Sequence, residues 1–163
     1  GPLPVEEYAM VAGSTFGERE FLLSLAGKDG VWMGKAIALT EVRIYQLTLE
    51  QLKGLCERHP FILCKLWIHA GSQVVTTSPH LFADFPTIYP SASVFAACTL
   101  KIGTSGLKYF LRHPMLLVQG TVQLPDETEV SAFTFLDPET TKSVMFTSER
   151  SAILLFPPQH EGI

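Results

Sequence analysis

The sequence predicts an α+β domain dominated by β-structure, arranged as an antiparallel β-sandwich or a distorted β-barrel with two or three short helices. Roughly seven to nine short segments have the apolar and polar patterning of strands. Glycine and proline separate many of these segments, as turns require. One further segment opens with a helix-capping motif, which adds helix to an otherwise β-rich chain.

The length indicates one domain. A chain of 163 residues is long enough for a single core but short for two independent ones. It begins Gly1-Pro2 without a methionine, so we interpret residues 1–2 as the scar of a removed tag. We expect residues 3–163 to be a single domain excised from a longer protein.

Two segments have helical patterning. Residues 4–12 place apolar side chains on one helical face, with a proline near the start. Thr48 and Gln51 have the spacing of a capping box, which predicts a helix over residues 49–58. Gly54 weakens this helix, and Pro60 is expected to end it. Residues 106–112 fit either a short helix or an extended strand.

The remaining patterned segments are predicted strands. Residues 61–69 give the strongest prediction, because every second side chain from Ile62 to Ile68 is apolar. Residues 27–30 and 124–127 are predicted hairpin turns. Residues 71–93 are expected to be an ordered loop packed through its aromatic side chains. The other predicted strands are residues 19–26, 31–39, 41–47, 94–102, 116–124, 129–136, 143–147 and 152–156.

The composition indicates a surface poor in charge. Apolar residues make up 47% of the chain and charged residues 17%, where a soluble domain has about 25% charged residues. We expect a partner to cover the region where apolar residues concentrate, namely residues 61–69, 81–89 and 94–98. The net charge is -4 and basic residues are scattered, which argues against nucleic acid as a partner. No apolar run approaches the ~18 residues of a membrane span, so no membrane partner is expected.

No catalytic or metal-binding spacing is present. Cys56, Cys64 and Cys98 are odd in number, form no CxxC motif and lie among apolar residues, so we predict reduced core thiols of an intracellular protein. The five histidines have no metal-ligand spacing. Cys64 and His69 would lie on opposite faces of their strand. We therefore expect no enzyme activity, no metal and no cofactor.

Lys65 and Trp67 are the leading candidates for partner binding. Two residues apart on a strand, they would project from one face, together with His69. Tryptophan beside a cation is a common interface hot spot. Phe82, Phe85 and Tyr89 of the aromatic loop complete the candidate set. The alternative is a half-buried lysine stem beside a core tryptophan, and full burial of Trp67 would favour it.

The stretch Phe61-Ile62-Leu63-Cys64-Lys65-Leu66-Trp67 resembles a strand of the YAP-binding domain of TEA-domain transcription factors. Residues 41–45, 52–53, 98–106 and 116–136 resemble neighbouring parts of that domain in the same order. The resemblance implies an immunoglobulin-like β-sandwich that binds coactivator peptides, with Lys65 and Trp67 at the contact. Gly103 stands where that family has its acylated cysteine.

A second resemblance is to the SPOC domain, a β-barrel with flanking helices that recruits transcriptional regulators. Val31-Trp32-Met33-Gly34 resembles its opening strand, and Leu155-Phe156-Pro157-Pro158 resembles a late strand. Both resemblances imply a non-enzymatic adaptor in transcription.

The sequence thus predicts a non-enzymatic protein-interaction domain of an intracellular, nuclear regulatory protein, which binds a peptide or partner protein through an apolar surface. Two alternatives stay open. One is a domain that binds, or acts on, an apolar small molecule or lipid between sheet and helix. The other is a homodimerisation module.

Overall fold

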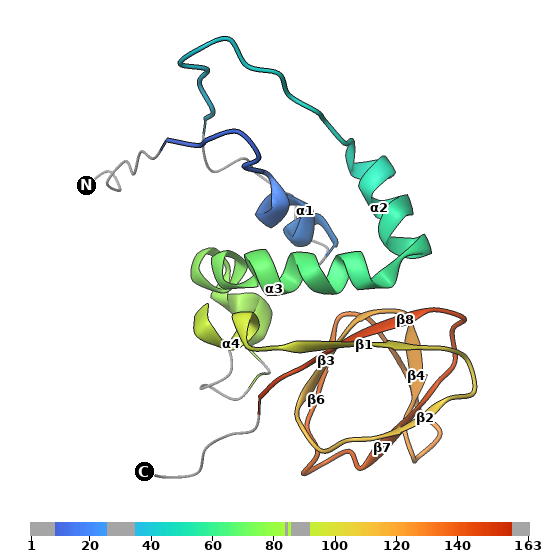
Figure 1. The fold of residues 1–163 in the computed structure, drawn as a ribbon. Helices are drawn as coiled ribbons and strands as arrows, with labels where there is room; N and C mark the ends of the chain where they lie inside the picture. Colours follow the sequence, from blue (N-terminus) through green and yellow to red (C-terminus); the bar gives the residue numbers. More distant parts are fainter. Residues whose placement is uncertain (1–8, 26–34, 84, 86–91, 158–163) are drawn as a thin grey trace, which may run out of the picture.

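The computed structural model describes residues 9–25, 35–83, 85 and 92–157. This part of the chain forms helices in its first half and antiparallel strands in its second half (Figure 1). The helices are α1 (Glu18–Leu25), α2 (Leu49–Arg58), α3 (Pro60–Thr77), the 3₁₀ turn η1 (Pro79–Phe82) and α4 (Ala92–Ala96). The strands are β1 (Thr99–Gly103), β2 (Lys108–Phe110), β3 (Met115–Gln119), β4 (Thr121–Gln123), β5 (Glu129–Ser131), β6 (Thr134–Leu136), β7 (Ser143–Phe146) and β8 (Ser151–Leu155).

The eight strands are the halves of four long, bent strands. One sheet has the order β1-β8-β3-β6 and the other has the order β2-β7-β4-β5. Pairing continues across the bends with small slips of register: Gly103 pairs with Ser151 and Lys108 with Met145, so one strand advances five residues while its neighbour advances six. The fold is therefore α+β, and its sheet folds over into a sandwich-like pair that does not close into a barrel.

Gly120 forms the bend between β3 and β4. Its φ of +93° lies in the left-handed region, which side chains with a Cβ rarely adopt. A Cβ at this position would lie 2.3 Å from Ser151 Oγ and 2.9 Å from the Arg150 carbonyl oxygen. The neighbouring Thr121 N–H donates to Ser148 Oγ at 3.0 Å, which holds the bend against the β7–β8 loop. The bend thus requires glycine for two independent reasons.

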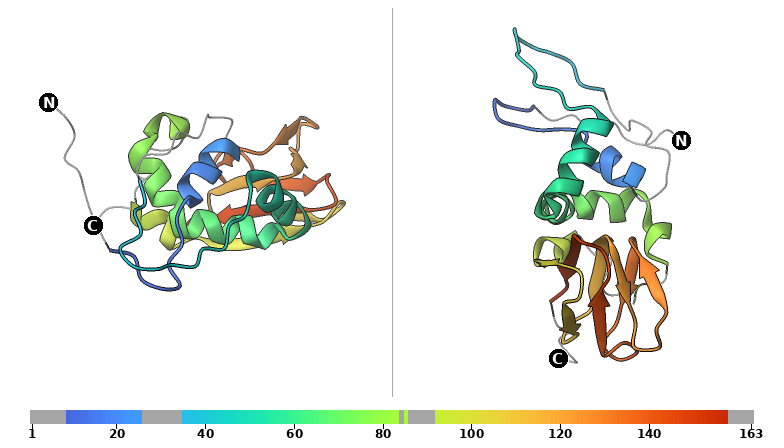
Figure 2. Two further views of the ribbon diagram at one scale, coloured as in Figure 1. Left: turned by 90° about the horizontal axis from the view of Figure 1, so that it is seen from above. Right: turned by 90° about the vertical axis from the view of Figure 1, so that its right-hand side faces the viewer.

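The sheet β1-β8-β3-β6 is the central layer of three. Figures 1 and 2 show α3 on one of its faces and the second sheet on the other. Within β8, Ala152 and Leu154 pack into the core beneath the helices, whereas Ile153 packs into the core between the sheets. Burial on both faces explains why this strand is an uninterrupted apolar run rather than an alternating one.

Helix α3 joins the helical layer to the sheet. The Cys64 thiol donates to the Ile153 carbonyl oxygen at 3.6 Å, where the helix crosses β8. The preceding helix is fixed as well, because the Arg150 guanidinium donates to the Arg58 carbonyl oxygen at 3.1 Å. This bond satisfies one of the free carbonyls at the end of α2. The C-terminal end of α2 is therefore attached to the β7–β8 loop. The chain that leads into α2 lies at the opposite end of this helix.

Several predicted elements are confirmed. Helix α2 spans residues 49–58 as predicted, and Thr48 and Gln51 form the reciprocal capping box. The hairpin of residues 116–136 is confirmed by the pairing of β3 with β6 and of β4 with β5. Strands β7 and β8 match the predictions at 143–147 and 152–156 to within one residue. Residues 108–110 are extended, which decides between the two interpretations of 106–112.

The strand predicted at residues 61–69 is wrong, because these residues belong to α3. The run is apolar almost throughout, so it satisfies the period of a strand and of a helix equally well. The helical period is the one realised: Leu63, Cys64, Trp67 and Val74 are buried. Pro60 occupies the first turn of α3, where its missing N–H costs nothing, and so begins a helix rather than only ending one.

Other predictions also need correction. Residues 18–25 form helix α1 rather than a strand, and residues 94–102 divide between α4 and β1. The loop predicted at 71–93 includes the end of α3 and η1. Residues 35–39 and 41–47 form no strand. Residues 9–12 are not helical, and the rest of the predicted helix at 4–12, the turn at 27–30 and residues 31–34 lie outside the described residues.

Among the helices of the described part of the chain, none combines the length and the apolar character that crossing a lipid bilayer requires.

Gly120→Ala is expected to destabilise the domain by about 2 kcal/mol or more, because it adds a strained φ to a contact with backbone. Gly54→Ala is the matched control: the new methyl group would meet only the flexible end of Arg58 at 3.6 Å within α2. It is expected to stabilise the domain by up to about 1 kcal/mol. Thermal and urea unfolding of both variants would measure this, and equal effects of the two substitutions would contradict the description of the bend.

Candidate interaction site

Lys65 and Trp67 do not share a surface. On a helix, residues two apart point in nearly opposite directions, whereas on a strand they would point the same way. Lys65 is exposed, and Trp67 is only 2% exposed. His69 is exposed on α3. Trp67 is therefore a core residue and does not form a binding face with Lys65 and His69. The partner contact of Lys65 and His69 stays a prediction.

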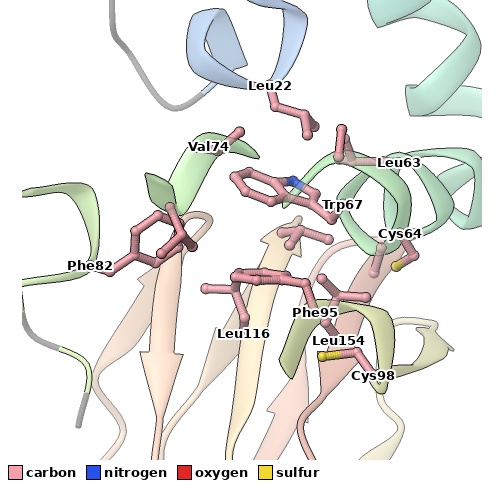
Figure 3. Close-up of a cluster of buried hydrophobic side chains, with 14 of the residues drawn as sticks. Leu22, Leu63, Cys64, Trp67, Val74, Phe82, Phe95, Cys98, Leu116 and Leu154 are labelled. Atoms are coloured by element: carbon pink, nitrogen blue, oxygen red, sulfur yellow. The ribbon is translucent and has the colours of Figure 1, made fainter. Parts of the chain in front are cut away.

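Trp67 lies at the centre of an aromatic cluster between the helices and the central sheet (Figure 3). Its ring centroid is 5.3 Å from that of Phe133 and 5.8 Å from that of Phe95, in stacked arrangements. Phe82 and Phe85 join the cluster and are 2% and 8% exposed. These aromatic residues of the predicted site are part of the core. Tyr89, the last predicted site residue, lies outside the described residues.

The alternative prediction was an apolar ligand bound between sheet and helix. The aromatic cluster lies in that position. Leu22 of α1 and Val74 of α3 approach Trp67 from the helical side, and Phe95 and Leu116 lie toward the sheet (Figure 3). Side chains fill this layer among the described residues. A hollow at the surface is lined by Glu41, Val42 and Arg43. None of these residues belongs to the aromatic cluster.

The three cysteines are buried and unpaired, as predicted for core thiols. Burial raises the pKa of Cys56 to about 11 and the pKa values of Cys64 and Cys98 to about 12. The thiolate is the nucleophilic form of cysteine, so these thiols are poorly suited to attack a substrate at neutral pH. Cys64 is buried and His69 is exposed, and five residues apart on α3 they point to different sides of the helix. Among the described residues, no group of three metal-ligating side chains forms.

A segment that precedes α2 carries the strongest exposed apolar signal. We call residues 37–47 the arm. It forms neither helix nor strand and bends at residues 39–40, and in Figures 1 and 2 it projects from the helical layer as a long loop. Tyr45 is 89% exposed and Leu39 is 86% exposed. Its six large apolar side chains are more than half exposed, namely Ile37, Leu39, Val42, Ile44, Tyr45 and Leu47.

The arm is apolar without being part of a core. Within the described residues, no backbone hydrogen bond is recorded between residues 37–47 and the rest of the chain. Its charged side chains are Glu41 and Arg43, which balance in sign. The sequence signal was present, because residues 41–47 have the pattern of a strand. What sequence reasoning missed is that no strand of the described part of the chain pairs with them.

A second exposed apolar feature lies on the edge of the second sheet. Among the strands of the described residues, β2 pairs with β7 alone. Phe110 is 64% exposed, and Met145 of the neighbouring strand is 39% exposed on the same outer face. The Lys108 Nζ atom lies 5.1 Å from the centroid of the Phe110 ring, above its face. Among the described strands, β2 is therefore an edge strand that also exposes an apolar side chain.

Comparison with known proteins does not assign the chain to a family: no protein-family model matches it, and no curated protein matches it.

Trp67→Ala is expected to destabilise the domain by about 3–5 kcal/mol, because it removes the ring on which the helical core packs. Lys65→Glu, in the same helix but exposed, is expected to change stability by less than about 0.5 kcal/mol. Urea unfolding measures both. A stable Trp67→Ala variant would show that the ring is not a core residue.

The thiols are expected to react slowly in the native protein. A pKa of about 11 rather than 9.0 lowers the thiolate fraction of Cys56 about a hundredfold at pH 8, and the reduction is larger for Cys64 and Cys98. Because the native thiols hold their protons more tightly than the unfolded ones, stability is full below pH 9 and falls as the pH rises toward about 12. Thiol labelling with and without urea, and unfolding as a function of pH, test this. Rapid native labelling at pH 8 would contradict it.

Proposed function

We propose that this chain is a non-enzymatic protein-interaction domain of an intracellular regulatory protein, and that it binds its partner through the arm. The observation that carries the proposal is the exposure of the arm's six large apolar side chains on a backbone that forms neither helix nor strand. An extended segment with unpaired backbone groups is suited to joining the edge of a sheet in another protein.

The energetics support a covered arm. Burying each of these side chains would contribute roughly 1–2 kcal/mol, given their present exposure. The six together offer on the order of 6–12 kcal/mol, from which the cost of ordering and association is subtracted. This is enough to drive specific binding. Without a partner, these exposed apolar side chains would leave an aggregation-prone segment at the surface.

The proposal moves the binding site away from the residues that the sequence favoured. Trp67, Phe82 and Phe85 are core residues, so they would support the site only by holding the helical layer on which α2 stands. Lys65 and His69 lie on α3, outside the arm.

We also propose a nuclear location and a role in transcription. They rest on the resemblance to coactivator-binding domains, whose main stretch, residues 61–67, is helical here rather than a strand. Imaging of the tagged protein in cells would test them, and exclusion from the nucleus would contradict them.

Substitution of the arm is expected to abolish partner binding without unfolding the domain. Ile44→Asp with Tyr45→Asp places two charges in the centre of the apolar segment. Phe61→Asp is the control, since Phe61 is 44% exposed and lies in the first turn of α3, where an acidic residue suits the helix. Quantitative affinity capture from cells compares wild type, arm variant and control.

Proteins retained by wild type and control but lost from the arm variant would support the proposal. Identical capture by all three proteins, with unchanged circular dichroism, would contradict it.

A further inference from the structure

We propose that the arm's partner is a second copy of this chain, and that the arm of each copy pairs with the β2 edge of the other. This inference rests on the proposed function and names its partner. It predicts a two-fold symmetric dimer in which two identical arm-to-edge contacts form, because an isologous arrangement uses the same surfaces on both subunits.

The first argument is that the arm cannot cover its own sheet edge. Figure 1 shows the arm on the side of the helical layer that faces away from both sheets. Strand β2 belongs to the sheet on the far side of the central layer. The two exposed apolar features of one chain therefore lie apart, so one molecule leaves both of them uncovered.

The second argument is that β2 is the edge of its sheet that exposes a large apolar side chain. Strand β5, at the opposite edge, presents the exposed Glu129 and follows Asp126 and Glu127, and acidic side chains discourage pairing. Strand β2 has one exposed charge, Lys108, whose Nζ atom lies 5.1 Å from the centroid of the Phe110 ring, and Phe110 itself is 64% exposed.

The third argument concerns the backbone of β2. The Leu107 carbonyl oxygen accepts from the Phe146 N–H, and the Leu111 N–H donates to the Lys142 carbonyl oxygen, both at 2.9 Å. In an antiparallel pair, alternate residues turn their backbone groups to opposite sides. The N–H and carbonyl groups of Lys108 and Phe110 therefore face the free side, where an extended arm can bond to them.

The fourth argument is the area. A large apolar side chain buries on the order of 100 Å² when it is covered, so six from one arm bury about 600 Å². One arm on a foreign partner would bury roughly 1,200 Å² in total, at the low end of specific interfaces. Two arms and two acceptor edges would bury roughly 2,400 Å², which lies in the range of permanent homodimers. Charge also permits the pairing, since Glu41 of the arm can meet Lys108 of the edge.

Sedimentation velocity and light scattering of the intact chain test the inference. The wild type is expected to be a dimer at micromolar concentration. Ile44→Asp, in the arm, and Phe110→Asp, on the edge, are each expected to give monomers with the circular dichroism of the wild type. Phe61→Asp is expected to remain dimeric.

A mixing experiment distinguishes pairing of the arm with the β2 edge of a second copy from other modes of association. Ile44→Asp retains an intact β2 edge, and Phe110→Asp retains an intact arm. An equal mixture of the two monomeric variants is therefore expected to form a heterodimer with one intact contact, weaker than the wild-type dimer but stronger than either variant alone.

A wild type that stays monomeric up to on the order of 100 μM, or a dimer that survives both substitutions, would overturn the inference. If the wild type is monomeric while the arm variant still loses proteins captured from cells, the second copy is the wrong partner and the proposed function stands. If the arm substitutions change neither association nor capture, both proposals fail.

Discussion

The rest of the structure depends on covering the central sheet on both faces. Strands β8 and β3 are apolar on each face, so neither a helical layer nor a second sheet alone would remove their side chains from water. The fold meets this requirement by bending its four long strands so that one half of the sheet covers the other, and by laying α3 across the remaining face. Gly120 makes one of these bends possible.

This constraint explains the composition of the chain. Two cores, one on each side of a thin sheet, need many apolar residues in a small domain, and they absorb the aromatic segments that the sequence suggested as a docking surface. The low charge fraction is therefore mainly a consequence of two cores. The arm and the β2 edge differ from these segments because their apolar side chains remain exposed.

Local signals predicted the parts of the fold that local interactions determine. The capping box of Thr48 and Gln51 defined α2, and the alternation of the 116–136 hairpin defined its pairing. Residues 61–69 could not be assigned in this way, because a helix buried between other helices and a sheet is apolar on most sides, and this removes the periodicity that distinguishes it from a strand. Burial of Trp67 and exposure of Tyr45 depend on tertiary packing, so the candidate site could not be located from sequence.

The central claim is that another chain covers the arm. Hydrogen–deuterium exchange of the intact protein, followed by peptide at low and high concentration, tests it most directly. The account predicts that the amides of residues 37–47, Lys108 and Phe110 exchange rapidly in dilute solution and become protected together as concentration rises, while the α3 core stays protected throughout. Arm amides that exchange rapidly at every concentration would contradict the pairing of arms with a second copy. Arm amides protected even in the dilute monomer would contradict the exposed arm itself.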